Sequence, residues 1–106
     1  MATEMAERSR HPWETKEMRE LFEAIQSLKT RQEVEAFFRD LCTISELEAM
    51  AHRWHVARLL ALELPYLEIA KRTGASTTTV TRVAHWLRHG EGGYETALTR
   101  APLPKF

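Results

Sequence analysis

Four threonines fall within five positions of the stretch GASTTTVTRVAHWLR, residues 74–88 of this 106-residue chain. Thr is a mediocre helix former because its branched side chain is stiff against the preceding turn. Small hydroxyl and methyl groups near the start of a helix can enter a DNA groove, where the hydroxyl bonds a base edge or a phosphate and the methyl contacts thymine. The stretch therefore predicts a helix face that touches DNA.

The spacing around these threonines indicates how such a face is held outward. Gly74-Ala75-Ser76 joins two short helices, and this arrangement has the dimensions of a helix-turn-helix. If Val80 faces inward, Val83, Ala84 and Leu87 follow at the spacing of one helical stripe. The residues that we expect to contact DNA are Lys71, Arg72, Ser76, Thr77, Thr78, Thr81, Arg82 and His85. The alternative is a helical corner with a Thr-rich surface that binds no nucleic acid.

The formal net charge of zero conceals a segregation of charge along the chain. Residues 1–49 hold 7 Lys and Arg against 11 Asp and Glu, a balance of −4. Residues 50–90 hold 6 basic against 2 acidic residues, a balance of +4, and the last sixteen residues balance. A neutral protein with a basic segment can bind a polyanion, because the local potential matters more than the total charge. Taken alone, this pattern is also common on solvated helices.

The apolar spacing is helical nearly throughout and predicts an all-α fold. We expect helices over about 14–28, 31–41, 44–62, 65–73 and 77–89, with Thr30–Glu33 and Thr43–Glu46 as capping boxes, although Ser45 could replace Thr43. Pro65 suits the first turn of its helix and Gly74 the end of that helix. The domain is expected over 14–90, with the helix-turn-helix at about 65–89. Residues 1–13 are expected to be flexible and 91–106 to form a short tail, with at most two helical turns in YETAL and an extended TRAPLPKF.

The helix expected over 44–62 is apolar around most of its circumference from Val56 onward. A helix that is apolar all round must be buried all round, and a chain of 106 residues has few other helices to surround it. This pattern favours a homodimer in which the partner covers the helix. The alternative is that the helices at 14–28 and 31–41 fold back over it.

Several other functions find little support. No run of eighteen apolar residues predicts a membrane span, the N-terminus lacks a signal-peptide core, and the single Cys42 suits a reducing cytoplasm. His52 with His55 and His85 with His89 have spacings that could share a metal ion, but no motif supports them, so we predict no metal and no cofactor. GEGG lacks the Lys-Ser/Thr of a phosphate loop and follows a helix, and we expect no enzymatic activity.

Residues 42–94 resemble the Trp-repressor superfamily. The chain is most similar to the YerC/YecD group of Trp-repressor-like proteins, and this resemblance extends over about residues 18–98. The specific motifs are LCTISEL, YLEIAKRTGAS followed by VTRV, and GGY after the helix expected over 77–89. The resemblance implies an intertwined homodimer that carries one helix-turn-helix per subunit. It further implies a bacterial transcriptional regulator whose two reading heads enter successive major grooves of double-stranded DNA about 34 Å apart.

The resemblance also implies where a tryptophan corepressor would sit. Arg53 and Arg82 match the arginines on either side of the indole, and Thr43 and Thr79 match threonines of the same pocket. Two positions depart from the motif, because Val83 replaces a glycine and Trp86 replaces a serine. Our hypothesis is that these larger side chains occupy the ligand volume and that Trp86 partly plugs the cleft. Trp86 could equally be an aromatic residue with no bearing on ligands.

Two departures bear on DNA recognition. In the first helix of the helix-turn-helix, the family's DNA-contacting positions align with Tyr66, Leu67 and Ala70. These residues are less polar than those at the same positions of Trp repressor. The long last helix of Trp repressor is replaced by GEGGYETAL and a short tail. The prediction is a DNA-binding regulator that does not depend on tryptophan. The alternatives are a dimeric protein-interaction module that no longer binds DNA, and a repressor that responds to tryptophan or another small molecule.

Overall fold

The computed structural model describes residues 11–101 and contains helices but no strand within them, which confirms the all-α class. The helices are α2 (Lys16–Ser27), α3 (Arg31–Leu41), α4 (Ile44–Ala61), α5 (Tyr66–Thr73), α6 (Thr77–His89) and α7 (Gly93–Arg100). They belong to two compact units, residues 1–42 and 43–106. Residues 1–10 of the expected flexible N-terminus and 102–106 of the expected tail lie outside the described residues.

The first unit holds α2 and α3, and each helix begins at a threonine cap. The Thr15 hydroxyl accepts a hydrogen bond from the Met18 N–H, and the Thr30 hydroxyl accepts one from the Glu33 N–H, both at 3.1 Å. The expected capping box at Thr30 is only half formed, because the Glu33 carboxylate accepts from the N–H of Lys29 instead, at 2.8 Å. No residue of either helix is buried.

The second unit begins with the other expected capping box, which is complete. The Thr43 hydroxyl accepts from the Glu46 N–H at 3.1 Å, and the Glu46 carboxylate accepts from the Thr43 N–H at 2.8 Å. Thr43, and not Ser45, is therefore the N-cap of α4.

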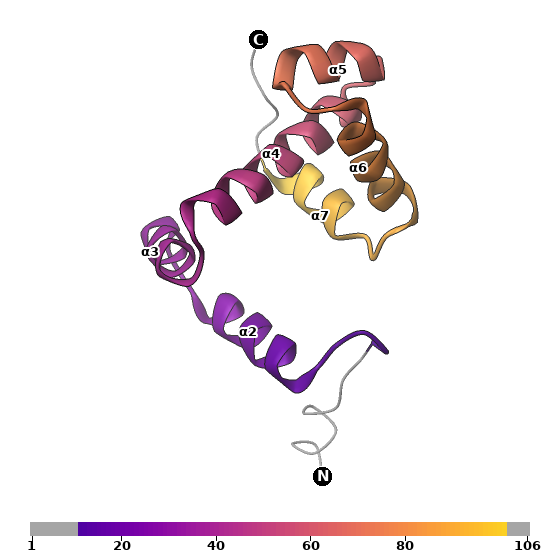
Figure 1. Cartoon of the computed structure of the whole chain (residues 1–106). Helices are drawn as coiled ribbons and strands as arrows, with labels where there is room; N and C mark the ends of the chain where they lie inside the picture. Colours follow the sequence, from indigo (N-terminus) through magenta and orange to yellow (C-terminus); the bar gives the residue numbers. More distant parts are fainter. Residues whose placement is uncertain (1–10, 102–106) are drawn as a thin grey trace. The chain divides into compact units, whose positions relative to one another are not determined.

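The hydrophobic core lies where α5, α6 and α7 pack around the C-terminal half of α4 (Figure 1). It is formed by Val56, Ala57, Leu59, Ile69, Val80, Val83 and Ala84. The sequence predicted that a partner chain, or the helices at 14–28 and 31–41, would bury the apolar helix that is now α4. Helices α5–α7 of the same chain provide part of that burial. Leu60 and Leu62 remain half-buried.

The connections between these helices depend on special backbone positions. Gly74 ends α5 in the left-handed conformation, with φ of 75°, as expected of a residue without a Cβ. Pro65 caps α5 from just outside the helix instead of lying in its first turn.

The C-terminal segment is more helical than its sequence suggests. Helix α7 follows Gly92, whose φ is 83°, and it includes Thr99 and Arg100. We expected these two residues to be extended, and that expectation was wrong because α7 packs on both α4 and α6. No described helix is both long and apolar enough to cross a membrane.

Candidate nucleic-acid interface

The eight residues expected to contact DNA are all exposed on the helix-turn-helix of α5 and α6. They are Lys71, Arg72, Ser76, Thr77, Thr78, Thr81, Arg82 and His85. On the opposite side of α6, Val80, Val83 and Ala84 are buried and Leu87 is half-buried, which confirms the inner stripe expected from the sequence. The threonines therefore face outward because the valines of the same helix anchor it to α4 and α5.

The outward threonines differ in what their hydroxyl groups can still do. The side chains of Thr77 and Thr78 have no hydrogen-bond partner among the described residues. The Thr81 hydroxyl donates to the Thr77 carbonyl at 2.9 Å, so its oxygen is left only as an acceptor. Thr81 can therefore accept a hydrogen bond from a base amino group, while Thr77 and Thr78 can either donate or accept.

Ser76 is occupied as the cap of α6. Its hydroxyl accepts from the Thr79 N–H at 3.1 Å and donates to the Thr79 hydroxyl, also at 3.1 Å. The N–H groups of Thr77 and Thr78 belong to the first turn and have no intrahelical carbonyl to bond. An anion at this end of α6 would therefore meet backbone N–H groups before the serine hydroxyl.

The two basic residues at the end of α5 are held differently. Arg72 Nε lies 2.8 Å from the Glu68 carboxylate one turn earlier, and this hydrogen bond, with the attraction of the Arg72 charge, lowers the pKa of Glu68. Lys71 forms no ion pair with any residue that the structure describes. Lys71 is therefore the more available cation for a phosphate.

The histidines of α6 form a small aromatic group at the end of the exposed face. The ring of His85 lies 5.2 Å from that of His89 and 5.7 Å from that of Trp86, measured between centroids. Across residues 11–101, no three His, Cys, Asp or Glu side chains gather as a metal site would require.

A groove between α4 and α6 brings together most of the expected effector-pocket residues. One hollow of about 250 Å³ is lined by Ala49, His52, Arg53, Thr79, Arg82 and Val83. A neighbouring hollow of about 330 Å³ is lined by Arg53, Arg82, Val83, Trp86 and Tyr94. Because the two share three residues, we treat them as one site, the α4–α6 groove.

Thr43 is the one expected pocket residue that a single chain does not bring to the groove. It caps α4 ten residues before Arg53, which corresponds to about 15 Å along a helix. Its hydroxyl and N–H are both engaged in the capping box with Glu46.

Trp86 lines the rim of the groove and leaves space beside it. Its side chain is 58% exposed, and one edge of its ring lies close to Gly90, where the chain turns away from α6. The buried Val83 lies directly after Arg82, at the position where the family motif has a glycine.

Tyr94 and His52 line the groove, but the sequence did not mark them as site residues. Tyr94 comes from α7, and its ring stacks on Trp54 of α4 with the centroids 6.3 Å apart and the planes 12° apart. The available signal was GGY, because Gly92 sets the start of α7. By itself that motif indicates only the family.

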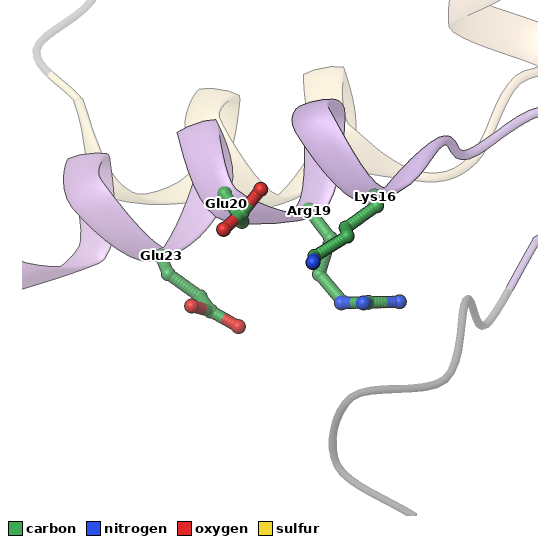
Figure 2. Close-up of a pocket in the computed structure, with 4 residues that line it drawn as sticks. All are labelled: Lys16, Arg19, Glu20 and Glu23. Carbon is green, nitrogen blue, oxygen red and sulfur yellow. The ribbon is translucent and has the colours of Figure 1, made fainter.

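A further hollow of about 230 Å³ lies on α2, in the first unit, and is lined by Lys16, Arg19, Glu20 and Glu23 (Figure 2). Along α2 the two basic side chains, Lys16 and Arg19, are followed by the two acidic ones, Glu20 and Glu23. Such a mixed set is typical of a solvated helix face.

The sequence model of the Trp repressor protein family matches residues 16–102, which include all six helices found between residues 11 and 101. The chain belongs to the Trp repressor family. It is 47% identical to the uncharacterized protein YerC of Bacillus subtilis (strain 168) over 85 residues, 80% of this chain and 82% of YerC. The expected membership of the Trp repressor superfamily, with its likeness to YerC, is thereby confirmed.

Two crystal structures show that the family fold extends over most of the chain. A TrpR-like protein from Eubacterium eligens ATCC 27750 is 42% identical, with a TM-score of 0.76, over 82% of this chain and 90% of that one. A proposed Trp repressor from Staphylococcus aureus is 34% identical, with a TM-score of 0.77, over 88% of this chain and 93% of that one. The helix-turn-helix therefore belongs to a Trp repressor-like fold.

Proposed function

We propose that this Trp repressor family member is a DNA-binding transcriptional regulator, a repressor, that acts in the cytoplasm as a homodimer. Helix α6 would enter the major groove. The observation that carries the proposal is its outward face, where Thr77, Thr78 and Thr81 are exposed above a buried valine stripe. These side chains are short enough to let the helix approach the base edges closely.

The charge on this face supports the same function. Lys71 and Arg82 are exposed on the two helices of the helix-turn-helix, and the first turn of α6 offers free N–H groups. Contacts of these kinds position a protein on the phosphates, while side chains that reach base edges supply sequence preference. Lys71 and Arg82 would therefore provide affinity, and the threonines selectivity.

The first unit supports the homodimer. Trp13, Met18, Phe22, Val34 and Leu41 are large hydrophobic side chains that are each between 39% and 51% exposed. Two amphipathic helices with no buried residue lack the apolar burial that stabilises a fold. A second copy of the chain would cover them, and it would set two α6 helices at a spacing that suits successive major grooves.

We further propose that regulation does not depend on tryptophan. The support is that Val83 and Trp86 stand in the α4–α6 groove where the family motif has glycine and serine. Their side chains take space on the α6 side, next to Arg53 and Arg82. The alternative of a tryptophan-responsive repressor stays open because the relative from Staphylococcus aureus is described as a proposed Trp repressor.

The central experiment is selection of bound duplexes from a random pool, with and without L-tryptophan. We expect a twofold-symmetric site to be enriched equally in both arms, with affinity that falls steeply as salt rises because condensed counterions are released. Absence of salt-dependent binding to any duplex would contradict the regulator. In that case the protein-interaction module, favoured by the exposed Leu67 and Trp86 of this unit, is the better interpretation.

Three substitutions separate base reading from phosphate contact. Thr81→Val keeps the methyl and removes the hydroxyl acceptor, while Thr81→Ser does the reverse, so each should change sequence preference at one base pair by about 1 kcal/mol. Lys71→Ala should weaken binding to all sequences and lower the slope of log affinity against log salt by about 1. Arg72→Ala, which removes a cation already paired with Glu68, is the matched control and should have the smaller effect.

A gain of function tests the effector proposal. The double variant Val83→Gly with Trp86→Ser restores the family motif, and L-tryptophan should then tighten its DNA binding by about fivefold or more. Wild-type affinity should not change. If L-tryptophan tightens the wild type as well, the tryptophan-responsive alternative is correct.

A further inference from the structure

We propose that Tyr94 is a positioning residue for the recognition helix: it joins α4, α6 and α7 so that α6 is held at a fixed orientation without a bound effector. The proposal rests on the DNA-binding function proposed above and adds a means by which the orientation of α6 is fixed. The juxtaposition that carries it is the stack of Tyr94 on Trp54, located at the end of the groove that α6 lines.

The core holds the two ends of α6 unequally. Its buried residues are Val80, Val83 and Ala84, all within the first two-thirds of the helix. Beyond them, Trp86 is exposed and Leu87 is only half-buried. The C-terminal third of α6 therefore needs a second support, and α7 is the helix that packs against it and against α4.

Tyr94 supplies the contact that links these helices. Its ring is half-buried, packs against the hydrophobic core and lies nearly parallel to the ring of Trp54 on α4. The same side chain borders the hollow that Arg82, Val83 and Trp86 of α6 line. A rigid aromatic side chain in this place sets the separation of α4 and α6, because its ring has few ways to rearrange.

The connection from α6 to α7 keeps Tyr94 close. The Gly90 N–H donates to the Trp86 carbonyl at 2.9 Å, and a Cβ at position 90 would lie 2.3 Å from that same oxygen. Only glycine fits this approach. Two residues later, Gly92 takes a left-handed φ of 83°, and α7 begins at Gly93. The connection from α6 to α7 is therefore short.

The orientation of α6 matters for specific binding more than for binding in general. Base contacts need side chains at set positions in two grooves at once, whereas phosphate attraction tolerates rotation of the helix. Loss of the Tyr94 support should therefore lower affinity for the selected site and leave affinity for an unrelated duplex nearly unchanged. A purely structural role, in contrast, would lower both together with helicity.

The test compares full-length wild type, Tyr94→Ala, Tyr94→Phe and the control Glu95→Ala, an exposed change on the same helix. Dissociation constants for the selected duplex and for an unrelated duplex are measured at one salt concentration, with sedimentation and circular dichroism on each variant. We expect Tyr94→Ala to lose at least tenfold for the selected duplex and less than twofold for the unrelated one. Tyr94→Phe and Glu95→Ala should stay within twofold of wild type for both.

Two results would overturn the inference. One is a Tyr94→Ala protein that binds the selected duplex within twofold of wild type; the other is an equal loss for both duplexes. If Tyr94→Ala does not fold, Tyr94→Leu, which keeps apolar volume without the flat ring, is judged by the same two criteria. Failure of the proposed DNA-binding function would be distinct, since wild type itself would then show no salt-dependent binding to either duplex.

Discussion

The two units of this chain use helices of similar quality in different ways. Helices α2 and α3 have well-formed caps and clear apolar stripes, yet neither holds a buried residue. Helices α4, α5 and α6 together contain seven buried side chains, and α7 packs on α4 and α6. Regular secondary structure is thus present in both units, but within the part of the chain that the structure describes a hydrophobic core is found in only one.

The difference shows what each unit requires. A helix of 11 or 12 residues is marginal in water by itself, and tertiary packing supplies most of its stability. The second unit obtains that packing from its own helices, whereas the first leaves its stripes for another surface. We therefore expect substitutions in the second unit, which carries the helix-turn-helix, to change the stability of the chain. Substitutions in the first unit should change its association.

The largest effect should come from the core of the second unit. Leu59 is fully buried, so Leu59→Ala removes apolar contacts and leaves a cavity, and it should lower the free energy of unfolding by about 3 kcal/mol. Leu67→Ala is the matched control, because Leu67 is 75% exposed and should change stability by less than about 0.5 kcal/mol. Urea unfolding measures both, and equal losses would contradict the assigned core.

A charge on the first unit should break association instead. Phe22 is 44% exposed on the apolar stripe of α2, where its ring contacts Trp13 edge-on. Phe22→Glu would place a carboxylate in the proposed subunit interface and should weaken dimerisation by tenfold or more in analytical ultracentrifugation. Glu23→Gln, on the charged side of the same helix, should leave it unchanged. A wild-type protein that is monomeric at all concentrations would refute this interpretation.

Amide exchange at different protein concentrations should distinguish the two units. On dilution toward dimer dissociation, the amides of α2 and α3 should lose protection more than those of Leu59, Ile69 and Val83, because local protection follows local packing. Hydrogen–deuterium exchange by mass spectrometry measures both units in one sample. Equal loss in all helices would mean that the core of the second unit also depends on the partner.

Much of the fold was predictable because its signals are local. The inner stripe of α6, the left-handed Gly74 and the Ser76 cap follow from residue types at fixed spacing, and all are present. Helix α7 was underestimated because YETALTR is short and lies between GEGG and the prolines of APLP, although Glu, Ala, Leu and Arg favour a helix. Its last two residues are helical because α7 packs on α4 and α6, and a linear sequence does not display such a surface.

The candidate site was predictable where it lies on one helix and harder to predict where it joins several. The exposed face of α6 follows from its periodicity. Tyr94 was missed because its relation to Trp54 spans forty residues, and no spacing rule links the two. Thr43 is named by the family resemblance, but one chain leaves it at the far end of α4. A partner subunit is the kind of element that could bring it to a groove.

The smallest effect concerns the capping box where the second unit begins. Thr43→Ala removes the cap of α4 and should lower the free energy of unfolding by about 1 kcal/mol. Thr30→Ala, which removes the half-formed box of α3, is the comparison for the first unit. If the two units differ as described, Thr43→Ala should lower the unfolding midpoint in urea of the chain more than Thr30→Ala, because the cap it removes supports a helix that carries the core. An equal shift for the two variants would contradict this.

The same box makes part of the stability of α4 dependent on pH. The hydrogen bond from the Thr43 N–H, followed by that with the Thr43 side chain, lowers the pKa of Glu46 below its ordinary value of 4.5. A carboxyl group with a lowered pKa in the folded state stabilises above its unfolded pKa, and that contribution is lost as pH falls through the folded value. Wild type should therefore melt at a higher temperature than Glu46→Gln near pH 7, and the gap should narrow below pH 4.5. A gap that is constant from pH 7 to pH 3 would show that the Glu46 charge does not stabilise the start of α4.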